Sequence, residues 1–568
     1  MNRRRSVIEI RRRLLLAFVS WSFVLALCSG ACAQEQSAAI ASAHPLATAA
    51  GYEILQRGGN AFDAAIAVAA ALAVVEPYSS GLGGGGFWLL RRARDGLQVM
   101  VDARETAPRK AALELFVDAA GKPVRSAITE GGKSAGIPGA PAALAHVARG
   151  YGKLPLAVSL APAIRLARDG FKVDPRFARI AQIRERFLQS YPDAARVFLD
   201  GRRAPQPGYL LRQPELAATL ERLGAAGAAG FYGGAVARAL VDAVNRNGGV
   251  WQLSDLADYK VVERTPVRFP FRGATVTVAS LPSGGGIALA QSLNILERFA
   301  PSDARSPEGA HLVIEAMRRA FQDRARYLGD SDFVAVPVER LVSKEYAEKR
   351  AATIDPGAAT SSNALEDEQT ARVESGNTTH LSVIDGEGNR VAATLSINWQ
   401  FGSGVVASAT GVLLNNEMDD FTLDPEVPNS YRLRGSGANA VAPGKRPLSS
   451  MTPAFVEDGK GVLVLGAPGG PRIVSQVLLA ILDYLEAPEV DLERIVRAPR
   501  YHHQWWPDRV EVEPEGFPAE WRAALEAKGH QLQSTARKWG NLQLVFKSKQ
   551  TGMARAASDP RGLDVGWY

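Results

Sequence analysis

Ser375-Gly376-Asn377-Thr378-Thr379-His380, followed by Leu381-Ser382-Val383-Ile384-Asp385, is the stretch that decides the fold. A threonine hydroxyl inside a chain is a weak nucleophile, but the α-amino group of an N-terminal residue titrates near about 8 and suits a general base. Cleavage after Asn377 would therefore give Thr378 a base of its own. Taken alone, Asn-Thr-Thr is more typical of a turn that opens a β-strand.

The residues that follow predict a β-hairpin. Residues 378–385 alternate and are rich in β-branched side chains, and Val391–Trp399 alternates again. Between them, Gly386-Glu387-Gly388 is typical of a tight loop. If the loop has three residues, Asp385 lies opposite Asn389.

This register has a consequence for the nucleophile. It places Thr378 opposite Ser396, with Cβ atoms about 5 Å apart. The two-residue period of a strand puts His380 and Asn398 on the same face. A loop one residue shorter or longer would turn Ser396 to the other face. The prediction therefore depends on the loop length.

The first 33 residues are typical of a secretory signal. Arg3–Arg5 and Arg11–Arg13 precede the apolar run Leu14–Leu27, and Ala31-Cys32-Ala33 offers a small-residue cleavage site. The run is shorter than the roughly 20 residues that span a membrane. We expect a periplasmic or secreted protein. A lipoprotein attached through Cys32 and export by a twin-arginine route are the alternatives.

Removing this leader changes what the composition implies. The 568-residue chain has a net charge of +7, and the leader holds six Arg, one Glu and both cysteines, which leaves +2 and no cysteine in residues 34–568. Such a charge gives no footprint for nucleic acid. Without cysteine there is no disulfide and no thiolate. No His-Glu-x-x-His or comparable ligand spacing occurs, so we predict no metal.

Other segments carry structural predictions. Ala64–Val75 is uniformly apolar and predicts a buried helix too short to span a membrane. The glycine runs Gly83–Gly86 and Gly284–Gly286 lack the ending of a phosphate loop and indicate backbones that approach closely. The polar stretch Pro356–Ser375 predicts a mobile segment before the cut, where two new termini would need to separate.

Several motifs that are weak singly occur together in one order. They are Arg104-Glu105-Thr106-Ala107-Pro108, Asn377-Thr378-Thr379-His380, Asn415-Asn416-Glu417-Met418-Asp419-Asp420-Phe421, Arg446-Pro447-Leu448-Ser449-Ser450-Met451, Pro468-Gly469-Gly470, Ala498-Pro499-Arg500-Tyr501-His502-His503-Gln504 and Ser558-Asp559-Pro560-Arg561. By these motifs the chain resembles the γ-glutamyltransferases, also known as γ-glutamyltranspeptidases or glutathione hydrolases. The resemblance covers nearly all of residues 34–568.

The resemblance implies a fold and a maturation step. The fold is the N-terminal-nucleophile fold, an α+β four-layer αββα sandwich shared by a large chain 34–377 and a small chain 378–568. Periodicity alone indicates only mixed α and β structure. The chains would arise by autocatalytic cleavage between Asn377 and Thr378, and they would remain partners. No cofactor is implied.

The implied reaction is acyl transfer. The Thr378 hydroxyl would attack the γ-amide carbonyl of glutathione or another γ-glutamyl donor and form an acyl-enzyme. Water would complete hydrolysis, and the amine of an amino acid or dipeptide would complete transpeptidation. The residues do not decide between these two outcomes.

The implied donor site has to bind two charged groups of the substrate, an α-carboxylate and an α-ammonium. A free α-carboxylate calls for a fork-like cation and hydroxyls, and Arg104, Ser449 and Ser450 match those positions. The α-ammonium calls for acids, and Glu417 and Asp420 match. Composition alone would make the arginine a surface ion pair, the acids a solvated turn and the serines a turn cap.

Four further residues complete the implied site. Gly469-Gly470 precede Pro471 and an apolar helical face, so their N–H groups would stabilise an oxyanion at a helix N-terminus. Tyr431, within the Pro/Gly/Asn-rich segment 425–445, matches the aromatic residue of a lid. Asn398 would bridge the groups that bind the donor's carboxylate and those that bind its ammonium.

One departure from the family and two rival functions remain. Ser396 stands where threonine is more frequent, which keeps the hydroxyl and loses a methyl group. A related acylase acting on glutaryl-type cephalosporin side chains would share Thr378 but need no ammonium-binding acids, so Glu417, Asp420 and Tyr431 argue against it. The other rival is an unprocessed, non-catalytic exported binding protein.

Overall fold

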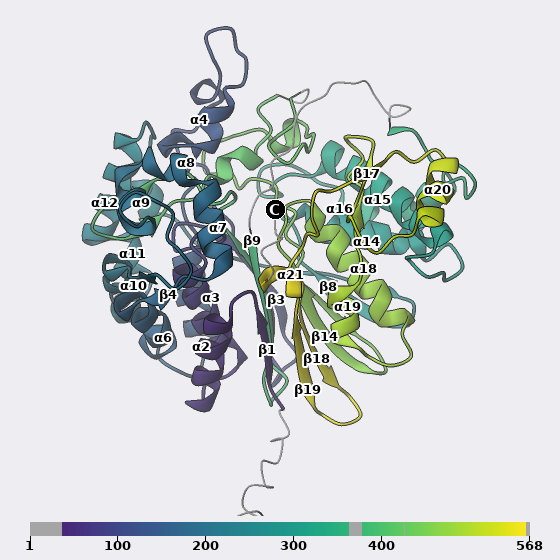
Figure 1. Ribbon diagram of the computed structural model, residues 1–568, viewed down its shortest axis with the longest axis horizontal. Helices are drawn as coiled ribbons and strands as arrows, with labels where there is room; N and C mark the ends of the chain where they lie inside the picture. The colour runs from purple at the N-terminus through teal and green to yellow at the C-terminus, as the bar shows by residue number, and fades with distance from the viewer. Residues whose placement is uncertain (1–36, 363–377, 425–426, 564–568) are drawn as a thin grey trace, which may run out of the picture.

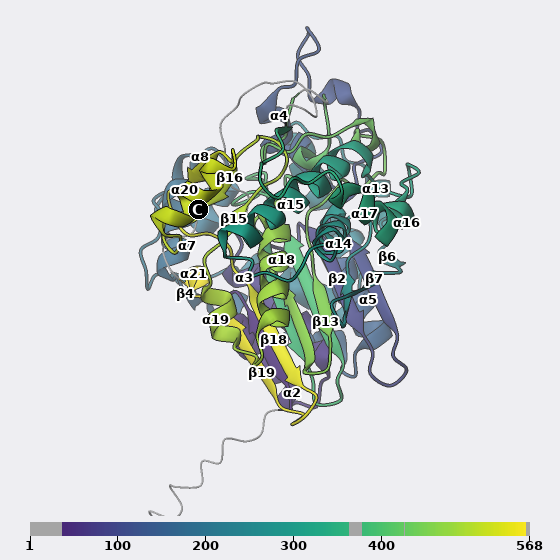
Figure 2. The same ribbon diagram turned by 90° about the vertical axis from the view of Figure 1, so that its right-hand side faces the viewer.

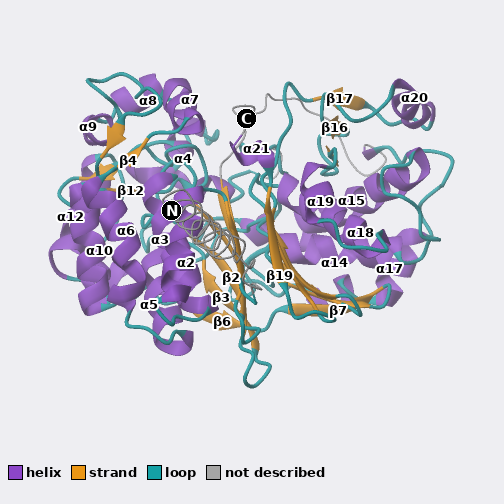
Figure 3. Ribbon diagram, turned by 60° about the horizontal axis from the view of Figure 1, so that its bottom comes forward, coloured by secondary structure: helices purple, strands orange, loops and turns teal. Residues whose placement is uncertain are grey.

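Two sheets lie face to face between two layers of helices (Figures 1 and 3). The computed structural model describes residues 37–362, 378–424 and 427–563. This arrangement is the predicted four-layer αββα sandwich. The leader, Asn377 and most of the polar segment before it lie outside the described residues.

Both sheets have six strands, and both mix strands from before and after Thr378. The first has the order β1 (Ala39–Ser42), β9 (Thr378–Ile384), β10 (Arg390–Ser396), β2 (Gly85–Arg91), β3 (Gln98–Ala103) and β6 (Val262–Arg264). The second has the order β19 (Ala554–Ser558), β18 (Gln543–Ser548), β14 (Gly461–Gly466), β13 (Ala454–Glu457), β8 (Ala274–Val278) and β7 (Val267–Phe271). The two segments therefore form one interleaved core.

Each sheet is covered by its own helical layer (Figure 1). The first sheet carries α2 (Pro45–Gln56), α3 (Ala61–Val75), α5 (Ala140–Tyr151), α6 (Leu156–Asp169), α10 (Pro214–Ala226) and α12 (Gly234–Arg246). The second carries α14 (Gly284–Leu296), α15 (Pro307–Tyr327), α17 (Lys344–Ala351), α18 (Arg472–Glu486) and α19 (Leu492–Arg497). Figure 2 shows α14, α15 and α18 in front of the second sheet.

Shorter elements decorate this core. On the side of the first sheet are α4 (Arg125–Thr129), α7 (Pro175–Ile183), α8 (Glu185–Gln189), α9 (Pro192–Phe198), α11 (Ala229–Tyr232), α13 (Leu253–Ala257), β4 (Phe171–Lys172), β5 (Leu210–Leu211), β11 (Val406–Ala407) and β12 (Val412–Leu413). The rest are α16 (Val338–Leu341), α20 (Ala519–Ala527), α21 (Pro560–Leu563), β15 (Tyr501–His502), β16 (Val510–Val512) and β17 (Leu532–Ser534). Within the described ranges, no helix combines the length and apolarity that crossing a membrane requires.

Helix α3 confirms the predicted buried helix at Ala64–Val75. Every residue of α3 is buried, as its Ala, Val and Leu content requires in the middle of a helical layer. It begins three residues earlier than its apolar run, at Ala61, because Asn60 and Asp63 form a capping box there.

The predicted hairpin register is confirmed. Strands β9 and β10 pair antiparallel with Thr378 opposite Ser396, and Asp385 N donates to Asn389 O across the loop at 3.2 Å. All residues of both strands are buried, since helices cover one face of the sheet and the second sheet covers the other. Strand β10 ends at Ser396, before the predicted Trp399, because the backbone turns to positive φ at Asn398.

The glycine runs do allow close backbone approach, as predicted. A Cβ on Gly84 would lie 2.0 Å from Ser396 O, and one on Gly286 would lie 1.9 Å from Ala279 O. Side chains at these positions would push β10 and the start of α14 out of place. The first run therefore helps to position the end of β10, where Ser396 lies.

Candidate active site

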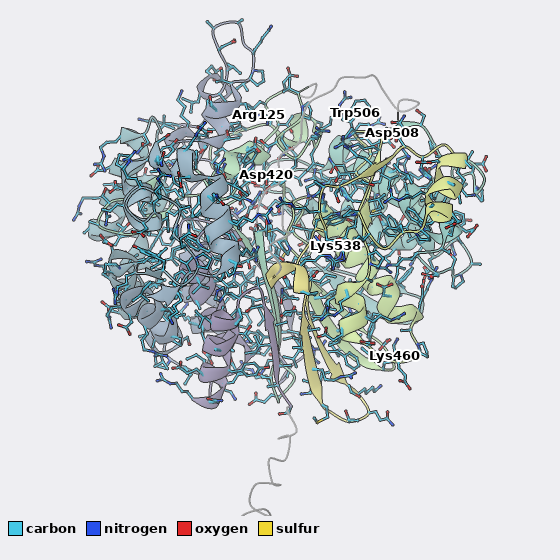
Figure 4. The ribbon with its side chains drawn as sticks, in the orientation of Figure 1. Arg125, Asp420, Lys460, Trp506, Asp508 and Lys538 are labelled. Carbon is cyan, nitrogen blue, oxygen red and sulfur yellow. The ribbon has the colours of Figure 1, made fainter. Side chains whose placement is uncertain are left out.

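One pocket, with a volume of about 320 Å³ including its open mouth, lies where β9 begins and β10 ends. Figure 4 shows Asp420, one of its residues, in the middle of the molecule near the ends of the central strands. The pocket brings together all the predicted catalytic and substrate-binding residues except Gly469: Thr378, Ser396, Gly470, Arg104, Asn398, Glu417, Asp420, Tyr431, Ser449 and Ser450.

The pair Thr378 and Ser396 forms one wall. Thr378 is buried, and its Oγ1 donates to Ser396 Oγ at 3.4 Å. The same serine oxygen accepts from Asn398 N at 2.7 Å. The next residue, Thr379, points to the opposite face and donates to Glu76 Oε2 at 3.0 Å. Of these two adjacent threonines, Thr378 alone lines the pocket.

Arg104 and its acids form the charged wall of the same pocket. Arg104 is 0 % exposed, so it is not a surface ion pair. Its Nη1 donates to Glu417 Oε2 at 2.6 Å and its Nη2 donates to Asp420 Oδ2. Its Nε donates to Pro447 O at 3.2 Å, and Glu105 Oε2 lies 3.5 Å from Nη1. The acids belong to a 3₁₀ turn, Glu417–Asp420, whose first residue is fully buried rather than solvated.

The pKa values of the ionisable groups in this wall are shifted by burial and by one another. Burial raises the pKa of Glu417 to about 7 and raises the pKa of Glu105 well above its usual value. Burial alone would lower the pKa of Arg104, but the carboxylates of Glu417, Asp420 and Glu105 raise it above its ordinary value. One guanidinium thus stays charged among three carboxyls, and burial disfavours the ionised forms of Glu105 and Glu417.

The two serines differ. Ser449 Oγ accepts from Met451 N at 3.1 Å, which is the turn cap that its residue type suggests. Ser450 Oγ is buried and has no hydrogen-bond partner among the described residues. Because a buried unpaired hydroxyl is costly, Ser450 is the serine available for a ligand.

The glycine pair lies ahead of helix α18. Gly469 has φ +123° and Gly470 has φ +56°, both in the region that favours glycine. Pro471 is the residue before the first helical residue, Arg472. Among the described residues no acceptor is paired with the N–H of either glycine. Two free N–H groups at a helix N-terminus are suited to an oxyanion.

Tyr431 packs against Gly470, the second residue of this glycine pair. A Cβ on Gly470 would lie 2.5 Å from the Tyr431 ring. Tyr431 donates its hydroxyl to Asn398 Oδ1 at 2.5 Å, and its carbonyl accepts from Gln504 Nε2 at 3.0 Å. Burial and the nearby acids raise the pKa of Tyr431 well above its usual value, so the hydroxyl remains a donor. Two residues of the segment 425–445 that contains it, 425 and 426, lie outside the described residues.

The sequence reasoning missed Arg324, Leu433 and Ile473, which also line the pocket. The sequence does contain a feature that could have indicated Arg324. Arg318 and Arg319, on the same helix, each have Glu315 three or four residues away, whereas Arg324 has no acid at either spacing. An arginine without a local partner on a helix that faces the core is a candidate for a site.

The histidines of the motifs are structural in their contacts. His380 Nδ1 pairs with Thr394 Oγ1 at 2.8 Å and its Nε2 pairs with Ser382 Oγ at 3.1 Å. Burial lowers the pKa of His380 to about 3, so it is neutral. No group of three or more His, Cys, Asp or Glu in the described part of the chain is arranged to hold a metal ion.

The layered fold places the protein in the class of N-terminal-nucleophile hydrolases. The cephalosporin acylase of Bacillus halodurans has a solved structure with a TM-score of 0.81 and 30 % identity, covering 93 % of this chain and 95 % of that one. The family model for gamma-glutamyltranspeptidase matches residues 47–566. The chain therefore belongs to the gamma-glutamyltranspeptidase family.

Two relatives show the range of names within this similarity. The glutathione hydrolase proenzyme of Escherichia coli (strain K12) is 41 % identical over 529 residues, covering 92 % of this chain and 90 % of that protein. The acylase ACY 1 proenzyme of Pseudomonas sp. (strain V22) is 37 % identical over 511 residues, covering 88 % of each. The chain is thus similar to enzymes that carry two different names.

Proposed function

We propose that this protein is an autoprocessed γ-glutamyltransferase and glutathione hydrolase whose nucleophile is Thr378. The single observation that carries the proposal is the pocket itself. It joins the Thr378 hydroxyl to two acids, Glu417 and Asp420, and to the Ser450 hydroxyl, which has no hydrogen-bond partner in the described part of the chain. A γ-glutamyl group carries an ammonium and a carboxylate on one carbon, so it needs both kinds of partner.

Maturation would use the same hydroxyl as turnover. Thr378 Oγ attacks the carbonyl carbon of Asn377, the C–N bond breaks, and the acyl group moves to oxygen as an ester. Water then hydrolyses the ester and leaves a carboxylate on Asn377 and a free α-amino group on Thr378. The large chain 34–377 and the small chain 378–568 stay together because both sheets contain strands of each.

Turnover follows in two steps. The α-amino group of Thr378 takes the proton as Oγ attacks the donor's γ-carbonyl carbon, and the N–H groups of Gly469 and Gly470 stabilise the oxyanion. The leaving amine receives the proton, the C–N bond breaks, and an ester to Thr378 remains. Water or an acceptor amine then attacks the ester. Ser396 orients the hydroxyl, and Tyr431 with Asn398 keeps bulk water from the ester.

The leader supports export as part of this proposal. The exported enzyme would act on glutathione or other γ-glutamyl compounds outside the cytoplasm. Two chains that begin near residue 34 and at Thr378, found by N-terminal sequencing of a periplasmic or culture fraction, are the expected result. A cytoplasmic enzyme with an intact leader would contradict it.

The test of function is release of p-nitroaniline from γ-glutamyl-p-nitroanilide, with and without a dipeptide acceptor. Thr378→Ala serves as the blank. Release that rises with acceptor means a transferase, and release indifferent to acceptor means a hydrolase. If correctly cleaved protein releases none, the proposed function is wrong.

A second candidate is a glutaryl-type acylase, favoured by the similarity to the acylase ACY 1 proenzyme and to the cephalosporin acylase structure. A glutaryl group is a γ-glutamyl group without its ammonium. The acids Glu417 and Asp420 would then have no cation of the substrate to bind. A kcat/KM for glutaryl-p-nitroanilide above that for the γ-glutamyl compound would favour this candidate.

A further inference from the structure

A group of charged residues lies outside the pocket, next to the residues that form its rim. Arg432 stands between two residues that line the pocket, and so does Arg472, but neither arginine lines it. Arg472 Nη2 lies 2.6 Å from Glu511 Oε2, and Arg509 Nη2 donates to Glu511 Oε1 at 3.1 Å. We call Arg432, Arg472, Arg509 and Glu511 the outer cluster.

A chain of contacts connects Arg432 to the rest of the outer cluster. The carbonyl of Tyr431, the residue before it, accepts from Gln504 Nε2 at 3.0 Å. Gln504 Oε1 pairs with His502 Nε2 at 2.9 Å, and His502 lies opposite Glu511 where β15 pairs with β16. Arg432 is therefore held beside Glu511 although the two are far apart in the sequence.

Arg432 is the unpaired member of the outer cluster. Within the described ranges its guanidinium makes no hydrogen bond and no ion pair, and its Nε is buried without a partner. Burial and Arg509 lower the pKa of Arg432, whereas Glu511 raises it. Glu511 is already shared by the other two arginines. Three guanidinium groups thus share one carboxylate, which leaves positive charge that an anion can match.

The backbone gives no local reason for an arginine at this position. Arg432 has φ +60°, in the region that favours glycine. Neither its backbone conformation nor a partner within the described part of the chain therefore stabilises this side chain. A strained residue with an unpaired charge at the rim of a pocket indicates a role toward a ligand.

The direction of the proposed reaction indicates which part of the substrate meets this cluster. The γ-glutamyl group occupies the pocket, with its carbonyl oxygen at Gly469 and Gly470, so the leaving group has to lie outside. The outer cluster flanks this glycine pair, because Arg432 follows the tyrosine that packs on Gly470 and Arg472 begins α18. The leaving peptide of glutathione ends in a carboxylate, and two extended residues reach about 7 Å from the scissile amide.

We propose that Arg432, supported by Arg472 and Arg509, binds the terminal carboxylate of the leaving peptide. Transfer to an amine is the reverse of acylation, so the carboxylate of an acceptor peptide occupies the same place. Arg432 is then a specificity residue on the leaving-group side, outside the pocket for the γ-glutamyl group. This inference deepens the proposed function and rests on it.

Two chromogenic donors that share one acyl group isolate the leaving-group side. γ-Glutamyl-3-carboxy-4-nitroanilide carries a carboxylate on its leaving group, and γ-glutamyl-p-nitroanilide does not. Because a charge-assisted hydrogen bond is lost, Arg432→Gln should lower the ratio of kcat/KM for the first to that for the second roughly tenfold. Arg432→Lys should recover part of the ratio. Arg432→Gly suits the positive φ and should lower the ratio as far as Arg432→Gln, which separates loss of the guanidinium from backbone strain.

The matched control is Arg238→Gln, which removes one positive charge from an exposed position on α12. It should leave the ratio of the two anilides at the wild-type value. A ratio that falls equally in this control would assign the effect to net charge and overturn the role of Arg432.

Direct binding keeps this inference separate from the proposed function. With the pocket filled by excess glutamate, calorimetry should show that glycylglycine binds roughly tenfold more tightly than glycylglycinamide, which lacks the carboxylate, and that Arg432→Gln removes the difference. If wild type cleaves neither anilide but this binding pattern holds, the proposed function fails and the assignment of Arg432 stands. Equal affinities in wild type, or an unchanged anilide ratio in an Arg432→Gln variant that unfolds at the wild-type urea concentration, would overturn the assignment.

Discussion

The two walls of the pocket are built differently. The nucleophile wall is one hairpin, in which Thr378 and Ser396 are 18 residues apart. The charged wall joins Arg104 to Glu417 and Asp420 across 313 and 316 residues. The backbone ladder of two adjacent strands positions the first wall, whereas side-chain contacts between distant segments hold the second. A single substitution in the first wall should therefore lower activity, whereas one in the second wall should lower the stability of the fold.

The largest expected effect lies on the nucleophile wall. Thr378→Ala should abolish both cleavage and turnover, because no other hydroxyl replaces its Oγ, while the strand ladder keeps the fold. A denaturing gel should show one band. The matched control is Thr379→Ser, which keeps the hydroxyl that bonds Glu76 and should give two bands. Two bands from the Thr378→Ala variant would contradict autocatalytic cleavage by Thr378.

The charged wall should lose stability instead. Arg104→Met leaves buried acids without their cation, which costs about 3–5 kcal/mol. Urea unfolding, followed in the uncleaved Thr378→Ala background so that one chain unfolds, measures this cost. The control is Arg92→Met at the partly exposed ion pair with Asp95, where the expected cost is below about 1 kcal/mol. Equal costs would mean that the buried cluster contributes nothing special.

A smaller effect is expected where the walls meet the lid. Gly470→Ala puts a Cβ 2.5 Å from the Tyr431 ring and strains a positive φ, and the two together cost about 1–3 kcal/mol. The displaced ring should lower kcat/KM about tenfold. In a Tyr431→Ala background the same substitution should lower kcat/KM less, because the clash is gone. An unchanged loss would assign the effect to the backbone alone.

The smallest effect is a pH dependence. A carboxyl with a raised pKa is neutral below that pKa. Because the pKa of Glu417 is about 7, its carboxylate binds the donor ammonium only as the pH rises past that value. The ratio of kcat/KM for γ-glutamyl-p-nitroanilide to that for glutaryl-p-nitroanilide should rise up to about tenfold from pH 6 to 8. Taking the ratio cancels the titration of the Thr378 amine. Glu417→Gln should make the ratio flat, and a ratio that already fails to change in wild type would contradict the role.

Local features were predictable to the extent that local physics decides them. The three-residue loop and the period of a strand placed Thr378 opposite Ser396, and the apolar run of α3 predicted its burial. The end of β10 was predicted too late, at Trp399. Apolar and polar residue types still alternate there, but the chain turns at Asn398. The side chain of Asn398 hydrogen-bonds Asn416 and Tyr431, which lie elsewhere in the sequence.

The sequence by itself determined the hairpin, the buried helix, the glycines of close approach and, through the order of its motifs, the family. Each depends on spacing along the chain, on which steric and hydrogen-bonding rules act directly. Only the tertiary structure decided that Arg104 pairs with Glu417 and Asp420. It also decided that Ser449 Oγ has a hydrogen-bond partner among the described residues, whereas the buried Ser450 Oγ and Arg324 Nε have none there. Charged groups pair with groups that are close in space, and burial sets the strength of these interactions. Neither the pairing nor the burial can be derived from how far apart two residues lie in the sequence.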